Sequence, residues 1–369
     1  MTTTAIATAV GPARAVTVWR FLRSCVSSPL NLLLTLALLL LAAIVVPWLV
    51  QWSVFDAVWS GTSAKDCVGH DGACWIYLRA RAEPLLFGAY PMSERWRVVA
   101  SMGLIGAAVL ALRTMYRHLR LWPIVVLLLG CSLAVGMLIH GGIGGLPVVP
   151  TSRWGGAMLT IVIAAWTIAT ALPLGLLLAL ARRSELPAVA LVAGAFIDLM
   201  RSLPLVGILF LMIVMFPLFV PPGVETDKLM RVLVAFTLFN AANFAEVFRG
   251  GLQAIPPGQI EAGRSLGLPK WQVTSLIIVP QAIAIAVPGL VNLCIAVIKE
   301  TTIVLIVGLF DFVGVLQAGM SDPDWLMAPS VRTTAYVFAA AVFWAICFAL
   351  SRYSRALERR AGFSPAARR

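Results

Sequence analysis

The sequence predicts an all-α, polytopic membrane protein with about eight transmembrane helices. Of its 369 residues, 60% are hydrophobic and only 12% are charged, whereas about a quarter of the residues in a soluble domain are charged. The apolar residues fall in blocks of about 20, the length that a helix needs to cross about 30 Å of hydrocarbon. This composition excludes a soluble enzyme. The net charge of +12 comes mostly from Arg residues between the apolar blocks, so it does not indicate nucleic-acid binding.

Eight apolar blocks are predicted to span the membrane, because each is bounded by charged or polar segments. They cover residues 30–50, 98–112, 121–139, 154–180, 205–220, 232–247, 282–298 and 333–350. The first block is too long for a signal peptide and is expected to be a retained anchor. Residues 181–204 carry too many charges to span and are expected near the inner interface. The apolar run 303–316 is interrupted by Asp311, and it is expected to be re-entrant or peripheral.

The distribution of basic residues predicts that both termini are cytoplasmic. With a cytoplasmic amino terminus, the inner segments carry 18 Lys and Arg residues and the outer segments carry nine. Cytoplasmic loops are enriched in basic residues, so this orientation is favoured. It places the long loop 51–97 outside.

This outer loop contains two of the six cysteines, Cys67 and Cys74. Their spacing suits a small disulfide ring in an oxidising compartment, and free thiols are the alternative. The three histidines are scattered without metal-ligand spacing, so no metal site is expected. None of the four lysines follows a glycine, so the chain has no P-loop for ATP and no cofactor of its own is expected.

A Gly- and Pro-rich connector, residues 140–150, predicts the boundary between two modules. Residues 1–150 form an N-terminal module of three transmembrane helices with the large loop 51–97. Residues 151–352 hold the other five helices, and residues 353–369 form a cytoplasmic tail.

The polar segment 249–281 separates two predicted spans and forms a knob outside the membrane. Pro256, Pro257 and Gly258 end the preceding helix, and residues 259–265 then form a short helix. Gly267 suits the left-handed position after a helix, and the next helix is predicted to run from residue 270 to Pro280. The small side chains on the short helix permit close approach of a cytoplasmic partner.

Within this knob the residues resemble a known motif. Glu261-Ala262-Gly263, then Gly267, then residues 277–280 ending in Pro280, resemble the EAA loop of permease subunits of ATP-binding-cassette (ABC) importers. Gly263 replaces the third Ala of the motif, and Val279 replaces a Leu. The flanking segments 243–251, 257–259, 280–282, 299–302 and 201–205 are similar to the histidine/polar amino-acid permease family. The resemblance covers about residues 154–350, and the N-terminal extension looks like that of the general L-amino-acid permeases.

This resemblance implies a type I ABC importer permease core in the C-terminal half, in a bacterial inner membrane. The chain would catalyse no reaction, because ATP would be bound by a separate ATPase subunit. The other implied partners are a second permease subunit, expected to form a heterodimer, a periplasmic amino-acid-binding protein and the surrounding membrane lipid. The implied ATPase-coupling residues are Glu261, Ala262, Gly263, Gly267 and Pro280. Glu246, Arg249 and Gln259 would form the entry to the coupling loop.

Four residues of the next helix are candidates for a pathway or a gate: Asn292, Lys299, Glu300 and Thr301. The segment 299–302 resembles the Lys-Asp-Thr-Ser run of the family. Ionisable residues inside a span are costly and usually functional, but Lys299 and Glu300 could instead pair with each other at the outer interface. Asn292, near Pro288, could equally make an interhelical hydrogen bond at a kink.

Glu246 and Arg249 could form a simple pair one turn apart, whatever their role in coupling. For the whole chain, the alternative function is a self-contained secondary transporter or channel for small polar solutes. Such a protein often shows an internal repeat, which is not visible here, and has no need of a large cytoplasmic loop.

Overall fold

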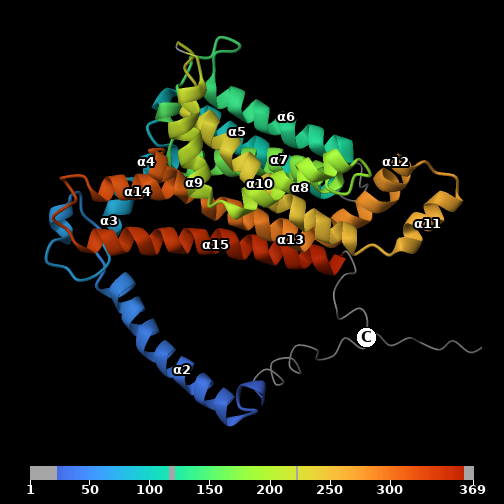
Figure 1. Cartoon of the computed structure of the whole chain (residues 1–369). Coiled ribbons are helices and arrows are strands. Elements are labelled where there is room, and N and C mark those ends of the chain that lie inside the picture. The colour runs from blue at the N-terminus through green and yellow to red at the C-terminus, as the bar shows by residue number, and fades with distance from the viewer. Residues whose placement is uncertain (1–22, 116–120, 222, 361–369) are drawn as a thin grey trace, which may run out of the picture.

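The computed structural model describes residues 23–115, 121–221 and 223–360, which form a bundle of helices (Figure 1). No β-strand occurs in these described residues; their β pairing consists of two isolated bridges, Val58 with Cys74 and Gly156 with Asp311. The predicted all-α fold is therefore confirmed. Of the predicted tail, residues 353–369, the part from residue 361 onward lies outside the described residues.

Seven helices are long and apolar enough to cross a membrane, and an eighth span results if one bent pair is counted as a single crossing. The long helices are α2 (Pro29–Val50), α5 (Arg95–Met115), α6 (Leu121–His140), α7 (Gly156–Ala181), α10 (Lys228–Gln253), α13 (Val279–Glu300) and α15 (Ser330–Arg360). The shorter helices are α3 (Trp75–Ala80), α4 (Ala82–Phe87), α8 (Pro187–Ser202), α9 (Leu205–Phe210), α11 (Pro257–Ser265), α12 (Lys270–Gln272) and α14 (Phe312–Met320). This agrees with the predicted count of about eight spans.

The bent pair consists of α8 and the segment Leu205–Phe219, which meet at an angle of 102°. The bend lies at Leu203 and Pro204, whose backbones are both extended. Proline disfavours the helical conformation of the residue before it, so the chain turns there. As the charges predicted, α8 is not a continuous part of a straight span.

The centre of the bundle is the tight contact between α7 and α10. Gly175 of α7 lies so close to α10 that an added Cβ would be 2.6 Å from Phe244 and 2.8 Å from the carbonyl of Ala241. In the same way, Gly251 of α10 faces the carbonyl of Ala282 in α13, at 2.5 Å from an added Cβ. Small residues allow transmembrane helices to approach closely, and they hold these three helices together. By contrast, α2 stands apart from the bundle and buries none of its side chains (Figure 1).

The prediction that the helix after the knob ends at Pro280 is wrong. From Lys270 to Val307 the chain forms one helical run of 38 residues, made of α12, the π-helical segment η8 (Val273–Ile278), α13 and a 3-10 turn, η9 (Thr301–Val307). Pro280 lies in the first turn of α13. The wider π-helical turn before it leaves space for the ring, which would clash with the carbonyl four residues earlier in a regular α-helix.

The apolar run 303–316 does not cross the membrane. It is divided between η9 and the nine-residue helix α14, and Gly308 makes the turn between them in the left-handed conformation. Nine helical residues rise only about 14 Å, less than half of the hydrocarbon thickness. Asp311 caps α14 by accepting a hydrogen bond from the backbone N–H of Gly314.

Candidate functional site

The knob formed by α11, α12 and the turn between them projects from one end of the bundle (Figure 1). Gly267 follows α11 with φ +76°, in the left-handed region, and its N–H donates to the carbonyl of Arg264 at 2.9 Å. Gly263 is buried against the base of the next helix, where an added Cβ would be 3.0 Å from Val273 and from Ile277. The replacement of the third Ala of the motif by Gly263 therefore has a packing reason in this chain.

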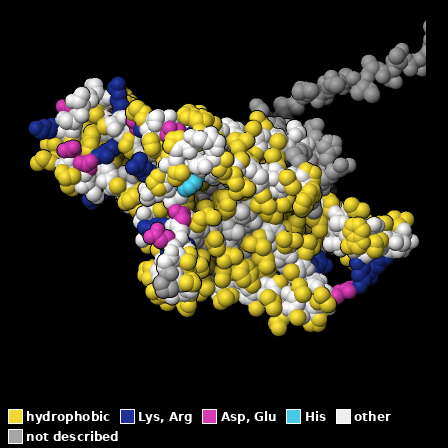
Figure 2. Space-filling view, turned by 90° about the horizontal axis from the view of Figure 1, so that it is seen from above, with side chains coloured by type: hydrophobic (Ala, Val, Ile, Leu, Met, Phe, Trp, Pro, Cys, Tyr) yellow, Lys and Arg dark blue, Asp and Glu magenta, His cyan; other side chains and the backbone are white. Residues whose placement is uncertain are grey.

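The outer surface of the knob combines polar and large apolar side chains. Glu261 and Ala262 are exposed, and so are Leu266, 78% accessible, and Trp271, 67% accessible. Figure 2 shows hydrophobic side chains at this projecting end of the molecule. Leu266 and Trp271 were not predicted as contact residues from the sequence, although an aromatic residue in a polar loop is a recognisable signal. Exposed apolar groups bordered by polar ones are typical of a protein-binding surface.

Two polar side-chain contacts connect the knob to the rest of the bundle. The Lys270 ammonium lies 2.6 Å from the carboxylate of Glu185, just before α8, and this contact lowers the pKa of Glu185. The amide of Gln281 in α13 donates to Gln259 in α11 at 3.2 Å. Gln259, predicted at the loop entry, thus lies at the contact between the knob and α13.

Glu246 lies at the centre of a cluster of charged side chains next to the knob. It accepts a hydrogen bond from Arg249 at 2.7 Å, which is the pair predicted from the sequence. It also contacts Arg182 at 3.2 Å and Arg201 at 3.6 Å, and Arg182 pairs with Asp198 at 3.0 Å. Arg182 ends α7, whereas Asp198 and Arg201 belong to α8. Only the fold brings these residues together, so the complete cluster could not be predicted from the sequence.

One face of α13 carries two of the four predicted pathway residues, Asn292 and Lys299. Gln281, Pro288, Asn292 and Lys299 are all exposed, and intervals of seven, four and seven residues place them on the same side of the helix. In the described part of the chain, the Asn292 side chain makes no hydrogen bond, and Lys299 makes no ion pair. Within this polar stripe, Asn292 and Lys299 are therefore unpartnered in the single chain, whereas Gln281 is bonded to Gln259.

Glu300 points away from this stripe. Its carboxylate accepts a hydrogen bond from the amide of Asn240 in α10, at 3.3 Å, and does not pair with Lys299. The hydroxyl of the buried Thr301 bonds to the carbonyl of Ile298 at 2.8 Å. The structure thus places Lys299 at the surface and Glu300 between two helices. Asn240, a buried polar residue of an apolar helix, was missed from the sequence.

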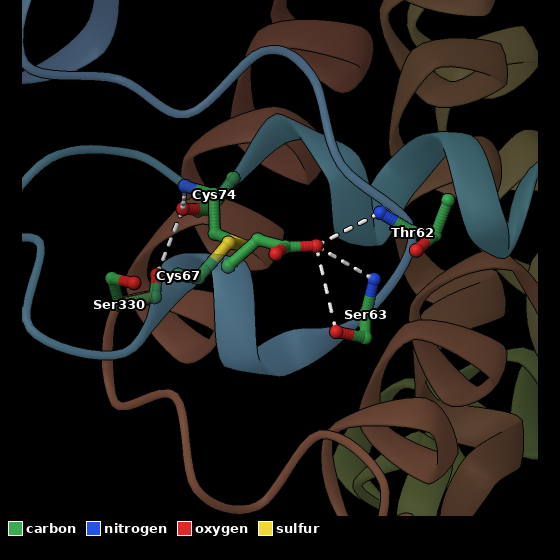
Figure 3. Close-up of a disulfide and its surroundings, with 7 residues drawn as sticks. Thr62, Ser63, Cys67, Cys74 and Ser330 are labelled. Atoms are coloured by element: carbon green, nitrogen blue, oxygen red, sulfur yellow. Dashed lines mark hydrogen bonds between the residues drawn. A yellow bond between two sulfur atoms is a disulfide. The ribbon is translucent and has the colours of Figure 1, made fainter.

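The two cysteines of the loop 51–97 form a disulfide, with their Cα atoms 5.9 Å apart (Figure 3). Beside it, the backbone N–H groups of Thr62 and Ser63 donate to the carboxylate of Asp66 at 2.9 and 3.0 Å. These backbone hydrogen bonds lower the pKa of Asp66. The N–H of Cys74 donates to Thr334 of α15 at 2.9 Å, so the disulfide ring is also tied to the far end of the chain.

Taken together, the long apolar helices and the EAA-like knob are those of a membrane transport subunit. Residues 171–362 match the family described as the inner membrane component of binding-protein-dependent transport systems. The match covers more than half of the chain, and the chain therefore belongs to this family. It is a multi-pass inner-membrane protein of the amino-acid ABC permeases, which are transport components and not enzymes.

Two similar proteins extend over nearly the whole chain. The inner membrane amino-acid ABC transporter permease YhdY of Escherichia coli K12 is 42% identical over 90% of both chains. BztC of Rhodobacter capsulatus, a permease for glutamate, glutamine, aspartate and asparagine, is 34% identical over 90% of this chain and 91% of its own. A solved amino acid ABC transporter with histidines is 30% identical, covers 56% of this chain and 92% of its own, and gives a TM-score of 0.48.

Proposed function

We propose that the chain is the permease subunit of a multi-subunit ABC importer and that it forms a translocation pathway for L-amino acids. A separate ATPase would bind the coupling loop, residues 249–281. The observation that carries this proposal is the projecting knob, where Glu261, Ala262 and Gly267 have the spacing of the EAA loop. The similar proteins YhdY and BztC are both described as amino-acid permeases, which supports amino acids as the transported class.

The proposed coupling uses the continuous helix that follows the knob. An ATPase pair that closes on ATP would push on Leu266 and Trp271, and the contact between Gln259 and Gln281 would pass this movement to α13. Because the helical run continues to Val307, the same movement reaches Asn292 and Lys299. A rigid element with two positions is the usual carrier of such a change.

The polar stripe of α13 is the proposed lining of the pathway. A second permease subunit, expected to differ from this one, would face the stripe and close the pathway from the other side. Lys299 would then present a positive charge to the carboxylate that every amino acid carries. In the proposed orientation both termini and the knob are cytoplasmic, and a periplasmic binding protein delivers the amino acid to the disulfide-containing end.

The proposal is tested by isolating the chain from its native membrane in mild detergent and identifying the proteins that remain bound. We expect a stoichiometric P-loop ATPase and a second permease. The complex is then placed in vesicles with the binding protein and radiolabelled amino acids. Uptake that needs ATP and persists when the proton gradient is collapsed supports the importer. Uptake by this chain alone, driven by an ion gradient, would identify the alternative, a self-contained secondary transporter or channel.

A further inference from the structure

The segment between α2 and α5 covers α14 and the beginning of α15. We call residues 56–87 of this segment, which end with α4, the cap. Figure 1 shows its helices α3 and α4 beside α14, at the opposite end of the bundle from the knob. The two sides share one apolar core, which contains Cys67, Cys74, Ile76, Tyr77 and Leu85 of the cap and Phe312, Leu316, Trp325, Val331 and Ala335 of the C-terminal part.

Polar contacts fix the cap to α14 at defined points. The hydroxyl of Tyr77, a fully buried residue, donates to the carbonyl of Leu316 at 2.7 Å. Burial raises the pKa of Tyr77 to about 12, so the hydroxyl keeps its proton and remains a donor. Arg81 forms an ion pair with Asp322, just beyond the end of α14.

Gly319 shows how closely Tyr77 fits against α14. A Cβ added to Gly319 would lie 2.5 Å from the Tyr77 hydroxyl oxygen, but 3.3 Å or more from the ring carbons. Even an alanine at this position would therefore have to displace the hydroxyl. The contact is a specific one between a single side chain and one turn of α14.

The other end of α14 is held by the core of the bundle. The N–H of Phe312 donates to Thr160 of α7 at 3.1 Å, and the N–H of Gly156 donates to the carbonyl of Phe310 at 2.9 Å. Between these contacts and the polar stripe there is only η9, which begins at Thr301, directly after Lys299 and Glu300. A displacement of α14 would thus be passed directly to the pathway residues.

We propose that the cap is a clamp on α14 and that Tyr77 is a positioning residue for transport. This inference rests on the proposed function. The clamp keeps α14 and η9 in register with α13 when the ATPase moves the knob. It gives the N-terminal part of this chain a role in coupling. Shorter permeases such as GltK of E. coli cover only 56% of this chain, although 91% of their own length is matched.

The test compares two tyrosine variants in the purified complex. Tyr77→Phe removes the hydrogen bond to Leu316 and leaves the ring in place. We expect the number of amino acids imported per ATP hydrolysed to fall about threefold to tenfold, the effect of losing one hydrogen bond of typical strength. Tyr90→Phe is the matched control, because Tyr90 is also buried and donates to a backbone carbonyl at 2.7 Å, but to Ile139 of α6. It should leave this ratio unchanged.

A pair of variants at the steric contact separates positioning from general stability. Gly319→Ala should lower the import ratio more than Tyr77→Phe does, because the added methyl group meets the hydroxyl. The double variant, Gly319→Ala with Tyr77→Phe, should recover part of the loss, since the obstructing oxygen is gone. Relief of the clash would restore the stability of the fold as well as the position of α14. The amount of complex and its thermal midpoint are therefore measured in parallel, and a recovered import ratio is assigned to positioning only where both are unchanged.

Three results would overturn the clamp: an unchanged import ratio in Tyr77→Phe, an equal fall in Tyr90→Phe, or no recovery in the double variant. These results differ from a failure of the proposed function. In that case the wild-type complex itself would show no ATP-dependent uptake.

Discussion

At the scale of single residues, Gly267 determines the shape of the knob. It has φ +76° and no atom within 4 Å of an added Cβ, so backbone conformation alone, and no steric contact, disfavours other side chains. A non-Gly residue costs about 1–2 kcal/mol in the left-handed region, and Asn and Asp cost less. Asp differs from Asn by the charge that it adds to the contact surface of the knob. We expect Gly267→Asp to reduce uptake more than tenfold while the protein still inserts in the membrane, and Gly267→Asn to keep much of the activity.

Gly223→Asp is the matched control for this prediction. Gly223 also has a positive φ, +90°, and open space around an added Cβ, but it lies in the loop before α10, away from the knob. Uptake and membrane level are measured for all three variants. Normal uptake by Gly267→Asp, or an equal loss in Gly223→Asp, would contradict the docking role of the knob.

Asp311 provides a prediction on stability and pH. Burial raises its pKa from 3.8 to about 6, against the lowering effect of the backbone N–H groups of Gly314 and Val313. When folding raises the pKa of a carboxyl group, the protein becomes less stable as pH rises from about 4 to about 6. The reason is that the folded state binds the proton more tightly than the unfolded state does. Asp311→Asn keeps an N-cap side chain without the charge. It should stabilise the protein by on the order of 1–3 kcal/mol at pH about 7.5 and by about half as much at pH about 5.

The measurement is the thermal midpoint in detergent at both pH values. Asp227→Asn is the control, because Asp227 caps α10 in the same way but is exposed. Asp227→Asn should produce no increase in the thermal midpoint that differs between the two pH values. A gain of equal size at the two pH values for Asp311→Asn would show that the buried charge is not its cause.

Individual positions differ in how far the sequence could predict them. Gly267 and the spacing of Cys67 and Cys74 depend on local geometry, which a short stretch of sequence contains. Asn240 and Arg182 acquire their partners, Glu300 and Glu246, across separations of 60 and 64 residues. Such contacts depend on which helices become neighbours, and local spacing carries no information about that.

At the scale of helices, α13 was predicted as a span, but its continuity with the knob was not. Pro280 normally indicates a helix end, and the compensation by the π-helical turn of η8 cannot be read from propensities. This continuity matters for function, because it joins Gln281 beside the knob to Lys299 near the other end of the helix. A movement of the knob can then shift or rotate the whole polar stripe.

The polar stripe of α13 gives a prediction on accessibility. In a chain whose free cysteines Cys25, Cys131, Cys294 and Cys347 are replaced by Ser, a cysteine at Asn292 should react with a small water-soluble thiol reagent. Leu290→Cys, two residues earlier, is the control, because Leu290 is buried on the opposite side of α13. Transported amino acid should slow the reaction at position 292. Equal rates at the two positions, with or without amino acid, would show that the stripe does not line a water-filled pathway.

At the scale of the whole molecule, the hydrophobic pattern predicted the helical class and the spans well, because the bilayer imposes one length on every crossing. It could not show that the cap packs against α14 and α15, which lie far from it in the sequence. Cys74 and Thr334 are 260 residues apart, and neither lies in a recognisable motif. The two functional ends of the molecule, knob and cap, are therefore connected by packing that only the complete fold reveals.

The same two ends allow the orientation of the protein to be tested. If the excess of basic residues does face the cytoplasm, the loop before α10 is periplasmic and the knob is cytoplasmic. In the cysteine-free background that also lacks Cys67 and Cys74, single cysteines are placed at Gly223 and at Ser265, both exposed. A membrane-impermeant thiol reagent should label Gly223→Cys in intact cells, and should label Ser265→Cys only after the membrane is opened. The reverse pattern would place the knob outside, where no ATPase could reach it, and would contradict the proposed importer.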